Sequence, residues 1–229
     1  MAVTDYTDHN PTDTGLTATT ACVAIVDDDD DLRESLIWLL DSVGLRTRAY
    51  ASGDAFLDAD PQQHDAILLD VRMPGLSGLQ VQQRLQGLDT CPPLIMISGH
   101  GDVSMAVAAL KAGAVDFIEK PFNQQQLIDI IQQALVIQRE RLNRQQRLSG
   151  LQQRYADLRL KEQQVLKEVA RGYTSREIAQ HLELSAKTVE VYRQRIMKAL
   201  GAGSLAHLIR LSVALELVDT LPDQQTPES

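Results

Sequence analysis

Short apolar runs alternate with amphipathic stretches over the first half of the chain. The apolar runs lie at residues 22–26, 45–50, 66–69, 94–97 and 115–118. The clearest amphipathic stretches between them lie at residues 32–43 and 103–112. Several runs are apolar throughout, which is typical of strands buried on both faces of a sheet. Five strands that alternate with helices predict a parallel, doubly wound α/β domain, in which ligands bind beyond the carboxyl ends of the strands.

A single helical pattern follows Phe122 and continues far along the chain. Its apolar stripe is ragged, and the segment 138–154 is crowded with Gln and Arg. Heptad spacing holds only from Leu148 to Leu158, which is too short to establish helix pairing. Two interpretations stay open: a solvated helical linker, or the seam of a coiled-coil dimer.

The C-terminal part has a helical pattern throughout. The expected helices cover residues 161–171, 175–181, 186–200 and 205–217. Gly172 and Gly201 stand where C-terminal caps are expected, and Thr174 and Ser185 stand where N-terminal caps are expected. Short helices joined by tight turns predict a helix-turn-helix module.

The two ends of the chain are polar, and we expect a disordered arm and a disordered tail there. The patterns together predict five parts: the arm (1–20), the α/β domain (21–138), a helical linker (139–156), the helix-turn-helix domain (157–218) and the tail (219–229).

The composition favours an ordinary globular protein, with 44% hydrophobic and 23% charged residues. No apolar run approaches the length needed to cross a bilayer, and the N-terminus does not resemble a secretory signal. Two cysteines, Cys22 and Cys91, cannot form a disulfide framework, and no Cys/His cluster suggests structural zinc. We therefore expect a cytoplasmic protein with no membrane partner.

Charge is distributed unevenly along the chain, whose net charge is -9. Residues 1–137 contain 7 basic and 20 acidic residues, a net charge of -13. Residues 138–158 contain 5 and 2, and residues 159–215 contain 10 and 5, so these segments carry +3 and +5. An acidic half joined to a basic half suggests two roles, one of which involves a polyanion.

Polar residues follow the predicted strands at positions that would meet at one edge of the sheet. They are Asp27 and Asp28 after the first strand, Asp70 after the third, Ser98 after the fourth and Lys120 after the fifth. Three carboxylates in one site call for a hard cation, and oxygen ligands suit Mg2+. Asp70 is then a carboxylate nucleophile for a phosphoryl group, whose charge Mg2+, Lys120 and Ser98 would stabilise.

Four stretches, VDDDDDLRESL, LLDVRMPGLSG, MISGHGD and KAGAVDFIEKPF, resemble the receiver domain of two-component response regulators. The spacings of 43, 28 and 22 residues between Asp27, Asp70, Ser98 and Lys120 fit that family. The resemblance covers nearly all of residues 21–138, is most similar to the FixJ-type branch and implies a flavodoxin-like (βα)5 fold. It also implies a cis peptide bond between Lys120 and Pro121.

The same resemblance implies roles for individual residues. Asp70 would accept a phosphoryl group from the phosphohistidine of a sensor histidine kinase. Asp28 and Asp70, with the Arg72 backbone carbonyl and support from Asp27, would bind Mg2+. Ser98 and Phe117 would form the switch pair, in which the hydroxyl moves toward the phosphoryl group and the aromatic ring follows inward.

Residues 186–200 form the candidate DNA-reading helix. Val189, Ile196 and Leu200 fall at helical spacing and should pack inward, which leaves a polar and basic face outward. The stretches EIAQHLELS, KTVEVYR and IMKALG are similar to the four-helix DNA-binding domain of LuxR/FixJ-type proteins. By position, that resemblance implies that three residues face bases: Glu190, Val191 and Gln194. Five others would mostly hold the DNA backbone: Lys187, Thr188, Tyr192, Arg193 and Arg195.

Two positions depart from the family's usual residues, and a third should restrict which DNA sequences are bound. Arg159 replaces the usual Thr or Ser, so the first helix of the domain should lack a capping hydroxyl. Tyr192 replaces a common His, yet its ring can pack and its hydroxyl can reach a phosphate. Glu190 at a base-facing position favours cytosine and repels phosphate, so it should narrow specificity.

The two resemblances imply a phosphorylation-dependent transcriptional regulator, and an activator by analogy with its branch. Its partners would be a sensor histidine kinase, double-stranded promoter DNA, RNA polymerase and, on phosphorylation, a second copy of the chain. The dimer surface would include Val107, Lys111 and Ile118. We do not expect an enzyme beyond self-phosphorylation and slow autodephosphorylation.

Three other classes of protein share part of this sequence pattern. An aspartyl-phosphate phosphatase usually has a second acid two residues after the nucleophile, where this chain has Arg72, and it needs a substrate cap domain. A phosphorylation-independent regulator usually lacks part of the acidic site, which is complete here. A quorum sensor needs a ligand cavity, which the acidic N-terminal domain does not suggest.

Overall fold

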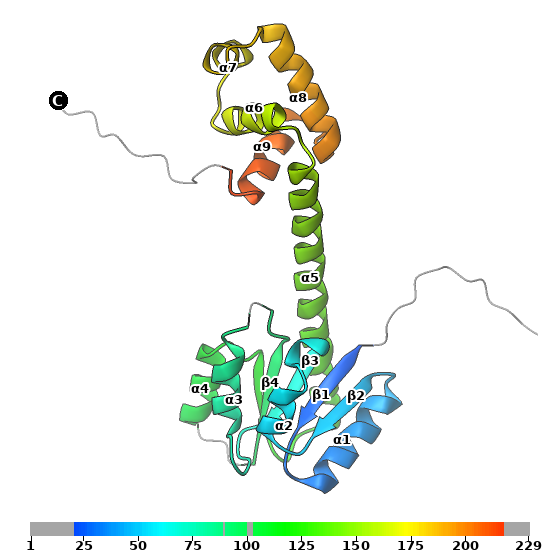
Figure 1. Cartoon of the computed structure of the whole chain (residues 1–229). Coiled ribbons are helices and arrows are strands. Elements are labelled where there is room, and N and C mark those ends of the chain that lie inside the picture. Colours follow the sequence, from blue (N-terminus) through cyan, green and yellow to red (C-terminus); the bar gives the residue numbers. More distant parts are fainter. Residues whose placement is uncertain (1–20, 89, 100–102, 218–229) are drawn as a thin grey trace, which may run out of the picture. The chain divides into compact units, whose positions relative to one another are not determined.

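The computed structural model describes residues 21–88, 90–99 and 103–217, and the predicted arm (1–20) and tail (219–229) lie outside them. The described residues divide into two compact units, with the boundary between Arg139 and Glu140. Figure 1 shows the elements of each unit.

The first unit contains a parallel sheet of five strands in the order β2-β1-β3-β4-β5. The strands are β1 (Cys22–Val26), β2 (Arg46–Tyr50), β3 (Ala66–Asp70), β4 (Leu94–Ser98) and β5 (Asp116–Glu119). All residues of β1, β3 and β4 are buried, whereas the edge strand β2 is largely exposed. This is the predicted flavodoxin-like sheet, and each strand agrees with its apolar run to within one residue.

Helices cover both faces of this sheet (Figure 1). They are α1 (Asp30–Ser42), α2 (Gly53–Asp58), α3 (Gly78–Leu85), α4 (Val103–Lys111) and the first part of α5 (Gln124–Ala156), with a 3-10 turn at Pro61–Gln63. One core cluster joins a sheet face to Leu36 and Leu40 of α1 and to Leu127 and Ile131 of α5. The second core cluster joins the other face to residues of α2, α3 and α4.

The second unit is helical. It comprises the end of α5 with α6 (Leu160–Ala170), α7 (Ser175–His181), α8 (Ala186–Leu200) and α9 (Leu205–Ala214). Thr174 and Ser185 cap α7 and α8 through their side-chain oxygens, and Gly201 ends α8 with a left-handed φ of 71°. These caps fall where the sequence predicted them, so both bounds of α7 and α8 match the expected ones. A third core cluster holds the unit together through residues such as Leu151, Val165, Ile178, Val189 and Leu208.

Candidate phosphoacceptor site and DNA interface

The carboxyl ends of four strands bring the predicted acidic site together. Asp27 directly follows β1, Asp70 ends β3, Ser98 ends β4 and Lys120 directly follows β5. Backbone hydrogen bonds join these ends: Val71 N–H donates to the Ile97 carbonyl at 2.9 Å, and Lys120 N–H donates to the Ser98 carbonyl at 2.7 Å. Strand order alone therefore places these residues at one edge of the sheet.

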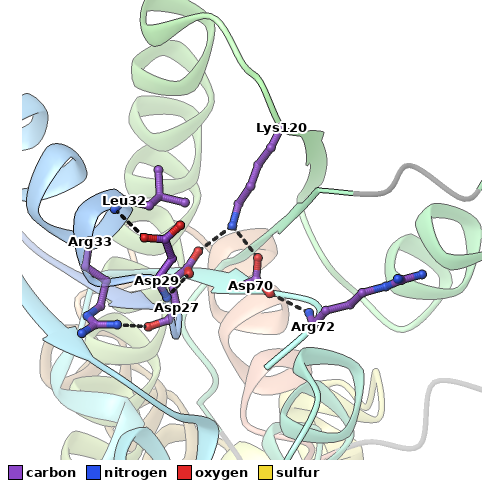
Figure 2. A network of polar contacts seen from close by, with 7 residues as sticks. All are labelled: Asp27, Asp29, Leu32, Arg33, Asp70, Arg72 and Lys120. Carbon is purple, nitrogen blue, oxygen red and sulfur yellow. Dashed lines mark hydrogen bonds and ion pairs between the residues drawn. The ribbon is translucent and has the colours of Figure 1, made fainter. Parts of the chain in front are cut away.

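Lys120 bridges two buried carboxylates (Figure 2). Its Nζ lies 2.7 Å from Asp27 Oδ2 and 2.6 Å from Asp70 Oδ1. Asp27 is 2% exposed and Asp70 is 5% exposed, so both carboxylates have left bulk water. One ammonium cannot neutralise two carboxylates, and the site keeps an excess of negative charge.

The protonation of this pair follows from burial and from the ion pairs. Burial raises the pKa of the Asp70 carboxyl above its usual range, although Lys120 opposes the change. Burial also works against the charge of Lys120, but its hydrogen bonds with Asp27 and Asp70 outweigh that effect and raise the pKa of its ammonium. Lys120 is thus a fixed positive charge beside the candidate nucleophile.

The connection from β3 to α3 orients the Asp70 carboxylate. Its Oδ2 accepts the Arg72 backbone N–H at 2.6 Å. Gly78, the first residue of α3, packs so tightly that a Cβ there would lie 2.2 Å from the Asp70 carbonyl oxygen. Ser77 and Gln80 form a capping box at the start of α3. The last glycine of the GLSG stretch, Gly78, therefore allows α3 to pack closely against the end of β3. The sequence analysis did not assign it this role.

The acidic run after β1 separates into different roles. Asp27 Oδ1 accepts the Asp29 N–H at 2.9 Å, and Asp29 caps α1 by accepting the Leu32 N–H at 3.2 Å. Arg33 donates to the Asp27 carbonyl at 2.5 Å (Figure 2). Arg33 also pairs with Asp30. Sequence reasoning missed Arg33, whose signal is a basic residue one turn into the helix that follows the acidic run.

Two of the three expected carboxylates converge. Asp28 is exposed, and within the described residues no group of three His, Cys, Asp or Glu side chains is arranged to hold a metal ion. The expected three-carboxylate cluster is therefore not assembled among the described residues, since Asp28 is exposed whereas Asp27 and Asp70 are buried. The donors that do meet, Asp27 and Asp70, are oxygen ligands with uncompensated negative charge, which suits a hard cation such as Mg2+.

The expected switch and dimer residues differ in burial. Ser98 is 1% exposed, whereas Phe117 is half-buried against the second core cluster. Val107 and Lys111 are exposed on α4. Ile118 is 4% exposed and belongs to the first core cluster, so the expectation that it lies on the dimer surface was wrong. In a sheet covered on both faces, neighbouring strand residues can both be shielded from solvent.

In the second unit, α7 and α8 form the predicted helix-turn-helix. Glu183 adopts a left-handed φ of 55° in the turn, and Leu184 N–H donates to the Ala179 carbonyl at 2.8 Å. Val189, Ile196 and Leu200 of α8 are buried, as their spacing predicted. Arg159 precedes α6 without a side-chain cap, and Glu162 instead accepts the Arg159 N–H at 3.0 Å.

The outward face of α8 carries most of the predicted DNA-contact residues. Five of them are exposed: Lys187, Glu190, Val191, Gln194 and Arg195. The other three are half-buried: Thr188, Tyr192 and Arg193.

Ser175 of α7 links two of these residues. Arg193 donates to the Ser175 hydroxyl at 2.9 Å, and that hydroxyl donates to the Glu190 carboxylate. The predicted backbone contact and the predicted base contact are thus joined in one network.

Comparison with protein families identifies a domain in each unit. Residues 23–132 match the response regulator receiver domain, and residues 157–212 match the bacterial regulatory proteins of the luxR family. Among the described residues, no single helix is long and apolar enough to cross a membrane, although α8 and α9, bent by 64°, together meet that test by length and composition.

Individual proteins resemble the chain over both domains. The response regulator protein TodT of Pseudomonas putida is 42% identical over 195 residues, which cover 85% of this chain and 86% of TodT. The transcriptional regulatory protein FixJ of Azorhizobium caulinodans is 41% identical over 192 residues, covering 83% and 91%. The structure of the response regulator StyR matches with a TM-score of 0.74 at 39% identity, covering 85% of this chain and 99% of StyR.

Proposed function

The chain belongs to the FixJ-like response regulators, which join a receiver domain to a luxR-family DNA-binding domain, and we propose that Asp70 is the residue through which it is controlled. Its function is phosphorylation-dependent regulation of transcription. The single observation that supports Asp70 is the bridge that Lys120 makes from it to Asp27.

The proposed phosphorylation is a displacement at phosphorus. An Asp70 oxygen attacks the phosphoryl group of a phosphohistidine on a sensor histidine kinase. The P–O bond forms as the P–N bond breaks, and the departing imidazole takes up a proton. Lys120, held 2.6 Å from Asp70 Oδ1, offsets the negative charge of the transferring group, and the Ser98 hydroxyl donates a hydrogen bond to one of its oxygens.

Receiver domains generally bind Mg2+ at the phosphorylation site. In this chain Asp27, Asp28 and Asp70, with the Arg72 carbonyl, would hold the ion, whose charge offsets that of the carboxylates and the phosphoryl group. The buried carboxylates supply two of these ligands, and the exposed Asp28 has room to supply another. The protein is not a typical catalytic enzyme, and the turnover that we propose is slow loss of its own phosphoryl group.

The output is DNA binding by α8 in the major groove. Glu190, Val191 and Gln194 read base edges, while Lys187, Thr188, Tyr192, Arg193 and Arg195 mostly contact the backbone. All three base-facing residues are exposed, as contact with base edges requires.

We further propose activation through dimerisation. Phosphorylation moves Ser98 and Phe117 and alters the surface formed by α4, β5 and α5, including Val107 and Lys111. Two copies then bind a two-fold symmetric promoter site and favour RNA polymerase. Because the output is DNA binding, the proposed location is the cytoplasm.

Sedimentation with and without beryllofluoride and Mg2+ tests this account. The wild type should shift from monomer to dimer and bind promoter DNA more tightly, because the fluoride complex mimics the phosphoryl group on Asp70. Asp70→Asn should stay monomeric, while Asp54→Asn, an exposed carboxylate on α2, should behave as the wild type. Dimerisation of Asp70→Asn to the same extent would refute the proposal.

A further inference from the structure

A groove of about 670 Å³ lies between the end of α5 and α9, wholly within the second unit. Leu148 of α5 and Leu211 and Ala214 of α9 give it an apolar lining. Three arginines of α5 also line it: Arg144, Arg147 and Arg154. An apolar surface beside three cations suits a ligand that is both apolar and acidic.

The three arginines have no acidic partner within the part of the chain that the structure describes. Arg147 donates to the Asn143 carbonyl at 3.1 Å, and Arg154 donates to the carbonyls of Gly150 and Leu200 at 3.1 and 3.4 Å. Backbone carbonyls accept hydrogen bonds but leave the guanidinium charge uncompensated. The groove therefore keeps a positive charge.

A second copy of the same surface is a poor occupant. A two-fold symmetric contact places each patch against its own copy, so the arginines of one chain would meet those of the other. Like charges brought together in this way destabilise the contact. Charge complementarity instead requires an acidic segment.

We propose that the groove binds the chain's own C-terminal segment, residues 218–229. That segment combines apolar Val218 and Leu221 with Asp219, Asp223 and Glu228, and it contains no Lys or Arg. It begins four residues after Ala214, which lines the groove. Four extended residues span about 13 Å, so its first apolar and acidic side chains are within reach.

The end of α9 favours this course. Glu216 adopts a left-handed φ of 55°, and Leu217 N–H donates to the Ser212 carbonyl at 3.0 Å. These contacts end the helix and turn the chain just before residue 218. The segment is joined covalently to α9, and such a short link gives an effective concentration of about 1 mM at the groove. Even a weak affinity for the groove is therefore enough for the segment to occupy it.

Binding of a labelled peptide of sequence VDTLPDQQTPES tests the proposal. In a full-length chain with Asp219→Asn, Leu221→Ser and Asp223→Asn, the groove should be open and bind the peptide. With a Kd of about 100 μM and an effective concentration of about 1 mM, the wild type should bind it roughly tenfold more weakly, because its own segment competes. A chain with Gln224→Ser and Gln225→Ser is the matched control and should behave as the wild type.

Substitutions of arginines, made in the chain with Asp219→Asn, Leu221→Ser and Asp223→Asn (the open chain), test whether the peptide binds in the groove. Arg147→Gln should weaken binding severalfold and reduce its salt dependence, whereas Arg139→Gln, an exposed arginine of α5 outside the groove, should not. Equal peptide binding by the open and wild-type chains, or no peptide binding by the open chain, would overturn the proposal. Sedimentation of the open chain gives a second check: dimerisation without peptide binding would assign the groove to another copy and also overturn it.

Discussion

At the scale of single residues, the surroundings of the Asp70 carboxyl set its pKa. Burial raises the pKa of the Asp70 carboxyl, and the Lys120 ammonium opposes that change from 2.6 Å away. A nucleophilic carboxylate must be ionised yet poorly solvated, and this pair of effects provides both conditions. Sequence spacing could place Asp27, Asp70 and Lys120 at one edge, but only the coordinates show one ammonium shared between two carboxylates.

His64 is a buried histidine away from the acidic site, and its role is structural. Its Nδ1 lies 3.1 Å from the Pro61 carbonyl, and its Nε2 lies 3.0 Å from the Tyr50 hydroxyl. A carbonyl only accepts hydrogen bonds, so Nδ1 carries the proton and Nε2 accepts from Tyr50. Burial lowers the pKa of His64 below its usual 6.5.

We predict that the first unit loses stability as the pH falls through 6.5. A histidine with a lowered pKa binds fewer protons in the folded than in the unfolded chain, so its contribution is complete above pH 6.5 and decreases below it. Calorimetry should show a larger drop in the Tm of this unit between pH 7.5 and 5.5 for the wild type than for His64→Gln. Equal drops in the two proteins would show that His64 does not cause the effect.

At the scale of elements, the ends of a helix could be predicted well where a capping residue marks them in the sequence. The helices α7 and α8 begin after Thr174 and Ser185, whose side chains cap them, so the sequence signal was local and sufficient. The burial of Ile118 depends instead on what packs against β5, and a four-residue strand gives too little pattern to show that. The same limit applies to α2 and α3, which the sequence analysis did not name individually.

Gly78 ties α3 to the site, and we predict that Gly78→Ala disturbs both. Its Cβ would lie 2.2 Å from the Asp70 carbonyl oxygen, so the β3–α3 connection must shift. Overpacking of this kind costs about 1–3 kcal/mol, and phosphorylation of Asp70 should slow as well. Gly87→Ala is the control, because its nearest atom would be 3.6 Å away. Urea unfolding measures the loss of stability, and labelling with acetyl phosphate measures the rate of phosphorylation. If Gly78→Ala equals Gly87→Ala in both quantities, the explanation is contradicted.

The outward face of α8 predicts two kinds of DNA-binding variant. Gln194→Ala should relax preference at one base pair by about 1–3 kcal/mol, because it removes a base-edge contact. Arg195→Ala should weaken binding to all sequences alike and reduce the salt slope by about 1, because it removes a phosphate contact. Titration of a promoter fragment and its single-base variants at several salt concentrations separates the two. Uniform weakening by Gln194→Ala would remove it from the base-reading set.

If Arg193 contacts only the DNA backbone, Arg193→Ala should weaken binding to all DNA sequences alike. The Ser175 hydroxyl now joins Arg193 to Glu190, so that substitution should also alter base preference where Glu190 contacts DNA. For this reason the exposed Arg195 is the cleaner test of a backbone contact.

At the scale of the whole molecule, the uneven charge follows the division of work between the domains. The acidic first unit holds the proposed phosphoacceptor site, and the basic second unit carries the proposed DNA-reading helix. Neither the overall net charge of -9 nor the composition reveals this, because a single sum does not show where along the chain the charges lie. The segment-by-segment count was the more informative quantity.

The connection between the units was harder to predict. The helical pattern expected to continue past Phe122 is present as one helix, α5, of 33 residues, so the expected linker at residues 139–156 is the later part of that helix and not a separate element. No Pro or cluster of Gly interrupts that stretch, so the sequence contains no local signal for a boundary. The domain bounds and the coiled-coil seam stay predictions, and a groove occupied by residues 218–229 would leave this part of α5 unavailable for pairing.

The central claim, that Asp70 is the phosphoacceptor, is tested most directly by intact mass. Wild type, Asp70→Asn and Asp54→Asn would be incubated with acetyl phosphate and Mg2+ and weighed by mass spectrometry. We predict a gain of one phosphoryl group by the wild type and by Asp54→Asn, and no gain by Asp70→Asn. An equal gain by Asp70→Asn would place the phosphoryl group on another residue and contradict the account.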